Sequence, residues 1–488
     1  MTLQISTKKL IWLYPLGCIL LSLPTLLNLE GLVNHQFKFY EELTGSLDSG
    51  LWALTWFLLM TLGYIALIKS LPLHFTKSVY FFYLLIVACF FATVPFGSTD
   101  VFYYIGAARD EIINMINPYS GGFYKIVPFI TKGNYLNGPI MYPPLWLQIN
   151  KIIWALSQAF GTLGQIYFYK LVFLVCHVMT ALVISKTASS KLSIIYFLNP
   201  LLLFEFATNA HFDALMLLLI ALAILSTKHQ KVALTLILLT LAALTKYTAV
   251  LFAPFFALFL LLKKVYGQHA TGAIDQRIGQ FLLWLIPGLF FSTILVAASF
   301  LPYWTQVGLE VFRGISLQSD WFMNSLFSTI YIPIIWIYQT ITLMIIPTVS
   351  AKYLWATLML FGTLVIFYYL VHEKVVSKFK NLSLETVLEL TTVAVLVFTI
   401  FFQRSFWPWY AAWPFLTGAY LGTKNKMFKL SLVLTLSSLT FYTIYSLFGY
   451  NSTQPLNSLQ VLYGMVIFAP VIVYAVFALI SRNSPQSL

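Results

Sequence analysis

The sequence predicts an all-α, polytopic transmembrane helical bundle. Hydrophobic residues make up 60% of its 488 residues and charged residues only 9%, whereas about half of the residues of a soluble domain are apolar. Segments near Leu10–Leu29, Leu51–Ile68 and Tyr80–Pro95 approach the ~20 apolar residues that a spanning helix needs, and similar segments recur towards the C-terminus. The alternation of apolar and polar residues that is typical of strands is absent. We therefore expect one integral membrane domain over residues 1–488.

The charge pattern indicates how the chain crosses the membrane. The net charge is +13, but the lysines are dispersed between apolar segments and form no basic domain, which argues against a nucleic-acid partner. Cytoplasmic loops carry an excess of Lys and Arg, and an alternating path that satisfies this rule has about 12–14 crossings with both termini in the cytoplasm. The bilayer is the partner that this path requires.

Several elements depart from simple crossings. Lys8 and Lys9 precede a long apolar run without a clear cleavage site, so we expect an uncleaved first helix. Polar residues interrupt Leu145–Phe160, which we expect along the membrane interface. Phe327–Pro347 is expected to be a hairpin or re-entrant piece, because one simple crossing there would put the next lysine cluster outside. The three cysteines lie within apolar segments and are expected to be inert: Cys18, Cys89 and Cys176.

The largest polar loop, residues 98–145, is expected to be an extracytoplasmic loop with interfacial helices, and Asp100 opens it. From Asp100 to Asn117 the sequence predicts one amphipathic helix, because Val101, Ile105, Ile112 and Ile116 form an apolar stripe at helical spacing. Asp100 then either caps this helix or acts as a general base, and the two roles are compatible.

A second polar group ends the apolar run that follows Asn199 and Pro200. Glu205, Asn209 and Asp213 recur every four residues and would share one face if a helix continued through them. An ionisable residue within or just above a membrane marks a functional site by default, and the alternative is a hydrogen-bonded network that holds helices together.

His211 and Asp213 also have the side chains of metal ligands. Two ligands at this spacing are a weak signal, and a third would have to come from elsewhere, for example from Asp100. We therefore expect neither a metal nor another resident cofactor, with a divalent metal as the alternative.

Further residues are candidates for binding a charged or sugar-like ligand. Lys246 lies between two short apolar segments, Val232–Leu244 and Tyr247–Leu262, and either extends to water or meets an anion such as a lipid phosphate. Arg404 precedes an aromatic run that suits either the interface or stacking on a sugar. The other candidates are Arg109, Tyr142, Asp320 and Trp409. A solvated face is the alternative for Asp320, and an aromatic belt at the membrane interface is the alternative for Trp409.

The predicted path places these groups on one side of the membrane, outside the cytoplasm. The chain has no phosphate-binding loop, no dinucleotide fingerprint and no cytoplasmic segment large enough to hold a nucleotide site. A donor substrate is therefore expected to be carried by the membrane.

Together these motifs resemble the GT-C glycosyltransferases, and most nearly the bacterial polyprenol-phosphate-mannose-dependent mannosyltransferases. The resemblance is carried by Ser98–Tyr104 leading to Asn117–Tyr119, by Tyr142–Pro144, by the Asn199–Asp213 block, and by Lys246–Tyr247 and Trp407–Tyr410, and it covers most of the chain from Ser98 onward. Relatives commonly carry an arginine soon after the motif aspartate and an Asn between the His and Asp, where this chain has Tyr103-Tyr104 and Phe212.

The resemblance implies an inverting transfer of mannose or another hexose from a polyprenyl-phosphate donor to an extracytoplasmic glycan, lipid or cell-envelope acceptor, at the plasma membrane of a prokaryote. It implies Asp100 as the base. The residues that would bind the donor phosphate are Lys246, Arg404 and Arg109, and those that would bind sugar or acceptor are Glu205, Asn209, His211, Asp213, Tyr142, Asp320 and Trp409.

Two other classes of protein fit a many-helix chain with intramembrane charges. A transporter or flippase of lipid-linked sugars is the main alternative, but transporters usually show paired halves with sites at the membrane midplane. Here the polar residues gather at one face and no repeat is evident. A non-catalytic scaffold is the third class, and it would not need this constellation.

Overall fold

The computed structural model describes residues 7–33, 43–71, 77–123, 137–266, 273–315, 323–342, 348–372, 383–449 and 458–480. The all-α, polytopic fold is confirmed. Apart from helices, the described residues include one short antiparallel pair of strands, β1 (Gly122–Phe123) and β2 (Asn137–Gly138). The chain divides into two compact units.

The first unit comprises Met1–Ala253, Leu283–Gln318 and Tyr445–Gly449. Its helices are α1 (Thr7–Leu10), α2 (Leu13–Leu27), α3 (Leu29–Val33), α5 (Leu47–Ser70), α6 (Lys77–Ala92), α7 (Asp100–Ile113), α8 (Pro144–Ser157), η1 (Gln158–Phe160), α9 (Gly161–Thr187), α10 (Ser190–Phe197), α11 (Pro200–Leu203), the π-helix η2 (Phe204–Thr208), α12 (Asp213–Lys228), α13 (Val232–Thr245), η3 (Tyr247–Phe252), the part of α15 (Ile274–Val307) from Leu283, and η4 (Gly308–Phe312).

The second unit comprises Pro254–Leu282, Ser319–Ile444 and Tyr450–Leu488. Its helices are α14 (Ala253–Tyr266) from Pro254, the beginning of α15, α17 (Leu326–Thr342), α18 (Thr348–His372), α19 (Leu384–Val397), the π-helix η6 (Phe398–Phe402), η7 (Pro408–Ala411), α20 (Ala412–Leu421), most of α21 (Lys426–Phe448), and α22 (Ser458–Ile480).

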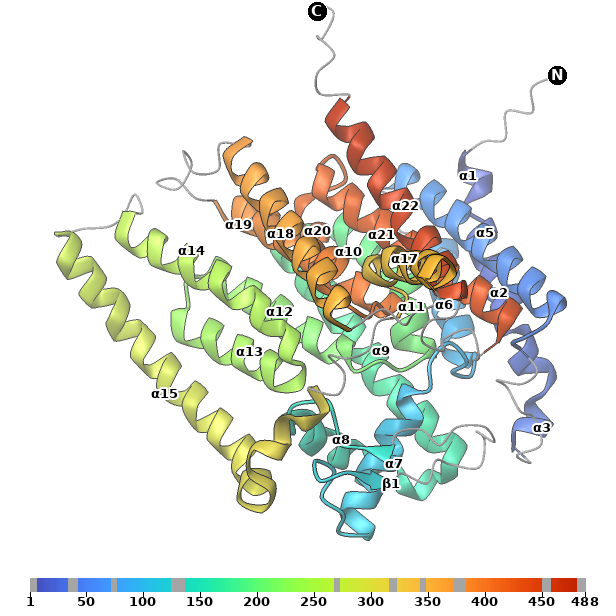
Figure 1. Cartoon of the computed structure of the whole chain (residues 1–488), viewed down its shortest axis with the longest axis horizontal. Helices are drawn as coiled ribbons and strands as arrows, with labels where there is room; N and C mark the ends of the chain where they lie inside the picture. Colours follow the sequence, from blue (N-terminus) through green and yellow to red (C-terminus); the bar gives the residue numbers. More distant parts are fainter. Residues whose placement is uncertain are drawn as a thin grey trace, which may run out of the picture. The chain divides into compact units, whose positions relative to one another are not determined.

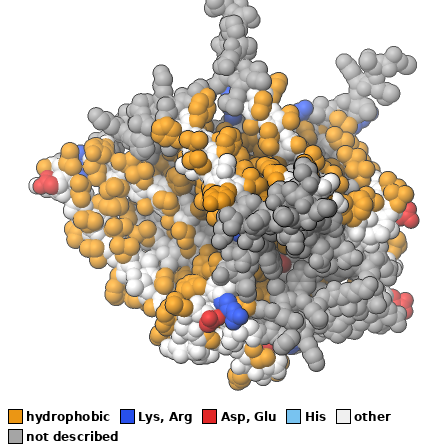
Figure 2. Space-filling model, in the orientation of Figure 1, with side chains coloured by type: hydrophobic (Ala, Val, Ile, Leu, Met, Phe, Trp, Pro, Cys, Tyr) orange, Lys and Arg blue, Asp and Glu red, His pale blue; other side chains and the backbone are white. Residues whose placement is uncertain are grey.

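The described helices suit a multi-pass membrane protein. Seven helical stretches are long and apolar enough to cross a membrane, or eight if the bent pair Ser190–Phe197 and Pro200–Thr208 forms one span, and five shorter apolar helices accompany them. Apolar side chains also cover much of the visible described surface, as Figure 2 shows. On α15, Leu283, Ile286 and Phe290 are exposed by 69%, 58% and 60%. Such a surface is stable in contact with lipid. The total of 12–14 crossings stays a prediction.

Close packing of α2 against α5 builds the N-terminal part of the first unit, where Figure 1 shows the two helices side by side. The contact needs small residues, because a Cβ atom at Gly63 would overlap the backbone of Tyr14 and one at Gly17 would overlap Met60. The Tyr14 hydroxyl donates to the carbonyl of Leu198 at 2.5 Å, so that α2 also meets the segment after α10.

Contacts within the first unit explain the polar residues that interrupt α8. Asn150 is fully buried, donates to the carbonyl of Tyr104 at 2.6 Å and accepts from the Tyr169 hydroxyl at 2.8 Å. Lys151 pairs with Glu111 at 2.6 Å, and Gln148 donates to the carbonyl of Ser299 at 3.4 Å. The interfacial placement of residues 145–160 stays a prediction.

Two helices differ from their expected course. The helix that begins at Asp100 ends at Ile113 instead of Asn117, because Met115 has a left-handed backbone with φ of 53°. It is also buried on all sides from Val101 to Ala108, so the expected amphipathic pattern is wrong for its first two turns. Before Asp213, the helix does not continue: the π-helix ends at Thr208, and Ala210 has a φ of 59°. Glu205, Asn209 and Asp213 therefore do not share one helical face.

Other expectations can be compared with the described residues. The segment 326–342 forms one continuous helix, so the expected hairpin does not turn there, and residues 343–347 lie outside the described residues. The three cysteines are buried free thiols, as expected. On α9, the Nε2 atom of His177 lies 2.9 Å from the carbonyl oxygen of Phe197 at the end of α10.

We expect Gly63→Ala to destabilise the protein by about 1–3 kcal/mol, because the added methyl group overpacks the α2–α5 contact. Thermal unfolding in detergent, followed by circular dichroism, measures the change. Gly279→Ala is the matched control, since a Cβ atom there meets nothing within 4 Å. Equal unfolding temperatures for Gly63→Ala and the wild type would show that the contact is not as tight as the structure indicates.

Candidate active site

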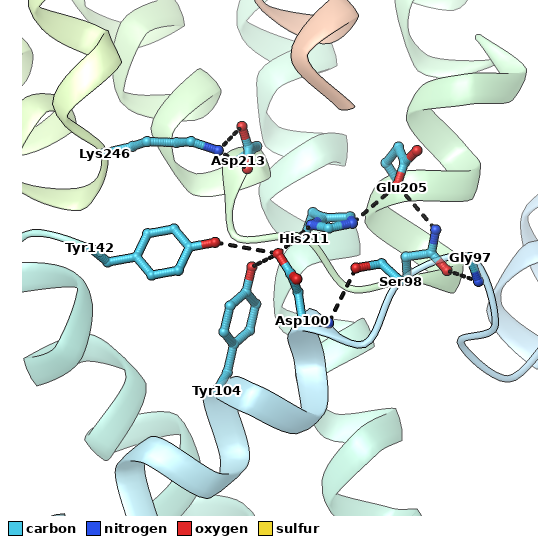
Figure 3. Close-up of polar contacts among 10 residues, drawn as sticks. Gly97, Ser98, Asp100, Tyr104, Tyr142, Glu205, His211, Asp213 and Lys246 are labelled. Atoms are coloured by element: carbon cyan, nitrogen blue, oxygen red, sulfur yellow. Dashed lines mark hydrogen bonds and ion pairs between the residues drawn. The ribbon is translucent and has the colours of Figure 1, made fainter. Parts of the chain in front are cut away.

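Asp100 begins α7 but does not cap it with its side chain. The N-cap is Thr99, and the backbone N–H of Asp100 donates to Ser98 Oγ at 3.2 Å. The Asp100 carboxylate instead accepts hydrogen bonds at Oδ2 from the hydroxyls of Tyr104 and Tyr142, both at 3.3 Å (Figure 3). Its side chain is 20% exposed. The Asp100 side chain is therefore held by these two hydroxyls and does not cap α7.

His211 lies between two carboxylates. Its Nδ1 atom is 3.4 Å from Asp100 Oδ2, and its Nε2 atom is 3.2 Å from Glu205 Oε2 (Figure 3). The side chains of His211 and Glu205 are fully buried. The backbone positions the ring, because the N–H of His211 bonds to the carbonyl of Glu205 at 2.9 Å across the break after the π-helix. Single turns of π-helix occur frequently at functional sites.

Asn209 joins this break to the loop before Asp100. Its side-chain N–H donates to Glu205 Oε2 at 3.1 Å, and its Oδ1 accepts from the backbone N–H of Gly97 at 3.2 Å. Thr208 adds a second link by donating to the carbonyl of Phe90 at 2.7 Å. The loop that delivers Asp100 and the loop that delivers His211 are therefore held together by side-chain hydrogen bonds.

Lys246 contributes a second basic group. It adopts an extended backbone conformation between α13 and η3, at the junction of the two short apolar segments seen in the sequence. Its Nζ atom lies 2.8 Å from both carboxylate oxygens of Asp213, the first residue of α12, and its side chain is only 13% exposed (Figure 3). Lys246 thus bonds to protein instead of extending freely to water.

Aromatic rings pack together beside the Asp100 cluster. The ring of Tyr142 stacks on Trp146 with centroids 4.5 Å apart, and Tyr104 meets Trp146 edge-on at 5.3 Å. Phe212 packs against Trp146 at 5.7 Å and against Phe173 at 5.2 Å. The ring of Phe212 therefore anchors the turn that carries His211 and Asp213 on its two sides.

The carboxylates determine the charge of His211. Burial disfavours the imidazolium, but hydrogen bonds and charges of Asp100 and Glu205 outweigh burial and raise the pKa of His211 to about 9. Burial likewise opposes ionisation of Asp100, but the hydrogen bond and charge of His211, with the charge of Lys246, lower the pKa of Asp100 below its usual value. At neutral pH the pair is a carboxylate and an imidazolium, so His211 is not a base.

Residues 27–262 match the family described as alpha-(1->6)-mannopyranosyltransferase, N-terminal domain. This part of the chain, just under half of its length, is therefore similar to a mannosyltransferase family. The match confirms the resemblance expected from the motifs and supports glycosyl transfer, with a sugar donor and an acceptor as substrates. No curated protein matches the chain.

The matched part contains the whole cluster around Asp100, namely Tyr142, Glu205, Asn209, His211, Asp213 and Lys246. It begins before Ser98 and ends before Arg404, so the resemblance of the C-terminal part of the chain stays a prediction.

Arg109 lies in the matched part but outside this cluster. Nine residues separate it from Asp100, which corresponds to ~14 Å along α7. Its Nε and Nη2 atoms bond to the neighbouring Asp110, at 3.2 and 3.1 Å. The structure therefore gives Arg109 a local partner, and phosphate binding by Arg109 stays a prediction.

Arg404 and Trp409 belong to the second unit, where each contacts aromatic rings. The Cζ atom of Arg404 lies 5.6 Å from the ring centroid of Phe327 and 6.0 Å from that of Trp355. Trp409 is buried and stacks on Trp407 with centroids 5.3 Å apart. Asp320 lies outside the described residues. The ligand-binding roles of these three residues stay predictions.

No group of three His, Cys, Asp and Glu side chains in the described ranges has the geometry of a metal site. Both nitrogens of His211 face carboxylates, and both oxygens of Asp213 face Lys246. The proposed metal ligands are therefore engaged by other groups. The expectation of no resident metal or cofactor stays a prediction.

Two residues of this region were not singled out from the sequence. Tyr104, one helical turn after Asp100, lies within the motif Ser98–Tyr104, but only the structure shows that its hydroxyl donates to the Asp100 carboxylate. Lys170 is fully buried on α9. Its position in the middle of a long apolar segment could have marked this lysine as important from the sequence alone.

The pairing of His211 predicts a specific pH dependence. An imidazole whose pKa is raised from 6.5 to about 9 on folding stabilises the protein fully below pH 6.5, and this stabilisation is lost as the pH rises through 9. We expect the wild type to unfold at a higher temperature than His211→Gln at pH 6.5, with the difference narrowing towards pH 9.5. His229→Gln removes an exposed histidine as the control. A difference that does not change with pH would contradict a charged His211.

Proposed function

We propose that the protein is an inverting mannosyltransferase that takes mannose from a polyprenyl-phosphate donor and transfers it to a hydroxyl of a glycan, lipid or cell-envelope acceptor. The observation that carries this proposal is the Asp100 carboxylate, held at Oδ2 by Tyr104, Tyr142 and His211 inside a domain of a mannosyltransferase family. A carboxylate fixed in this way and kept ionised suits a general base.

In this mechanism Asp100 acts on the acceptor. Because the three described contacts meet Oδ2, the acceptor hydroxyl gives its proton to Oδ1 as its oxygen attacks the anomeric carbon of the mannose. The bond between that carbon and the phosphate oxygen breaks in the same step, and polyprenyl phosphate leaves. One displacement of this kind inverts the configuration at the anomeric carbon.

Negative charge grows on the departing phosphate, so a cation beside it lowers the barrier. Lys246 is our choice within the described cluster, because Nζ has three donors and Asp213 fixes its position. Binding of the sugar and acceptor by Glu205, Asn209, His211, Asp213 and Tyr142 is a further part of the proposal. Roles for Arg404 and Arg109 at the phosphate, and for Trp409 and Asp320 at the sugar, are further parts of the proposal.

The lysine distribution supports a site on the extracytoplasmic side, because the path that keeps the lysine-rich loops in the cytoplasm puts residues 98–145 outside. The sequence has no nucleotide-binding motif, which agrees with a donor anchored in the membrane. Together with the family resemblance, this supports the plasma membrane of a prokaryote as the proposed location. The cluster and the family match favour glycosyl transfer over the transporter alternative.

We expect Asp100→Asn to lower kcat by about 100- to 10,000-fold, because an amide cannot take the acceptor proton. The assay follows mannose transfer from polyprenyl-phosphate mannose by the reconstituted protein, with products identified by mass spectrometry. Asp48→Asn is the matched control, as Asp48 is an exposed aspartate in the first turn of α5. Turnover by Asp100→Asn near that of the wild type would remove Asp100 as the base.

For Lys246→Met we expect weaker use of the donor, seen as an approximately tenfold or larger rise in donor KM with a smaller change in acceptor KM, because a phosphate contact is lost. Initial rates over a range of donor concentrations measure the change. Lys263→Met, in the last turn of α14, serves as the control. An unchanged donor KM would mean that Lys246 serves only as the partner of Asp213.

A further inference from the structure

The C-terminal end of α6 is bonded by side chains from other helices. Four consecutive carbonyl oxygens, those of Phe90, Phe91, Ala92 and Thr93, each accept a side-chain hydrogen bond. Thr208 donates to Phe90 at 2.7 Å, and the Tyr167 hydroxyl donates to Ala92 at 2.6 Å. Lys170 Nζ donates to the remaining two, Phe91 and Thr93.

The last carbonyls of a helix have no partner within the helix, and burying them without one is costly. Lysine suits this position, because Nζ supplies several donors and the end of a helix attracts positive charge. Here the residue is fully buried, and Nζ lies 4.6 Å from the ring centroid of Tyr167 and 5.3 Å from that of Phe91. A lysine in an apolar helix is itself costly, so its two carbonyl bonds satisfy both groups at once.

The chain after this end leads directly to Asp100. From Thr93 it continues through Val94, whose N–H donates to Thr25 Oγ1 at 3.1 Å, and Gly97, whose N–H donates to Asn209. Six residues separate Thr93 from Asp100. Lys170 therefore fixes the beginning of this short segment, and Asn209 fixes its middle.

We propose that Lys170 is a positioning residue for Asp100 and acts through the end of α6. This inference rests on the proposed function, in which Asp100 must lie within hydrogen-bond reach of the acceptor hydroxyl. Lys170 makes none of the described contacts of the Asp100 carboxylate. Lys170 instead determines where the Asp100 carboxylate lies, and a small displacement of a catalytic base lowers the reaction rate by a large factor.

The test compares Lys170→Met with Lys170→Arg and Tyr167→Phe in the full-length, reconstituted protein. We expect Lys170→Met to lower kcat by about 10- to 100-fold with both KM values changed less than about threefold, because substrate contacts remain while the base is misplaced. Lys170→Arg keeps donors at this position and should recover part of kcat. Tyr167→Phe removes one of the four bonds without changing shape, and should lower kcat by a smaller factor even if Lys170→Met does not fold.

The matched control is Lys228→Met. Lys228, the last residue of α12, also donates to a terminal helix carbonyl, that of Thr187 at 2.7 Å. However, Lys228 is exposed, and Thr187 ends α9 instead of leading to Asp100. This variant should transfer mannose like the wild type.

Hydrogen–deuterium exchange gives a readout that does not depend on activity. Amides of residues 94–104 should exchange at least about tenfold faster in Lys170→Met than in the wild type, while those of 213–228 stay unchanged. If the wild type transfers no mannose, the proposed function fails, and exchange alone then tests whether Lys170 fixes this segment. The inference would be overturned by any one of three results for Lys170→Met. These are an unchanged kcat with unchanged exchange, a change in KM alone, and faster exchange throughout the first unit.

Discussion

Lipid chains supply neither hydrogen-bond donors nor acceptors. A buried polar group of a membrane protein can therefore form hydrogen bonds only with other protein groups or with water held within the protein. The contact of His211 with Asp100 and Glu205 meets this constraint. Two carboxylates close together in a poorly polar surrounding repel each other, and the imidazolium between them removes that repulsion. Each charge stabilises its neighbour, so the loss of one member leaves another charge buried and uncompensated.

The polar groups also lie where helices are interrupted. Asp100 follows the end of α6, His211 follows a π-helix, and Lys246 stands between α13 and η3. Buried backbone groups at a helix break need partners from the protein, and Asn209, Thr208 and Lys170 supply them here. Within the second unit, another π-helix, Phe398–Phe402, precedes the segment with Arg404 and Trp409.

The sequence was sufficient to predict the helical membrane fold, because composition and the length of apolar runs depend on the solvent and not on detailed packing. It also indicated that Asp100, His211, Asp213 and Lys246 gather together, since ionisable side chains are rare in such a chain, and the structure pairs His211 with Asp100 and Lys246 with Asp213. Their roles and their side of the membrane stay predictions. The bonding within the site was not predictable. The helix expected through Glu205, Asn209 and Asp213 is broken by a π-turn and by Ala210 at φ 59°, and neither has a clear signature in its residues. Likewise, Arg109 bonds to its own neighbour, Asp110, which spacing could not show.

The helix α9 carries two polar side chains that reach separate loops. Lys170 bonds to the end of α6, and His177, seven residues later, bonds to the end of α10. Two helical turns, ~10 Å, separate these residues on one face of α9. The helix therefore fixes the distance between the segment that leads to Asp100 and the segment that leads to Glu205 and His211. Inserting a single residue between positions 170 and 177 would rotate one contact by ~100° relative to the other, so that α9 could no longer bond to both segments.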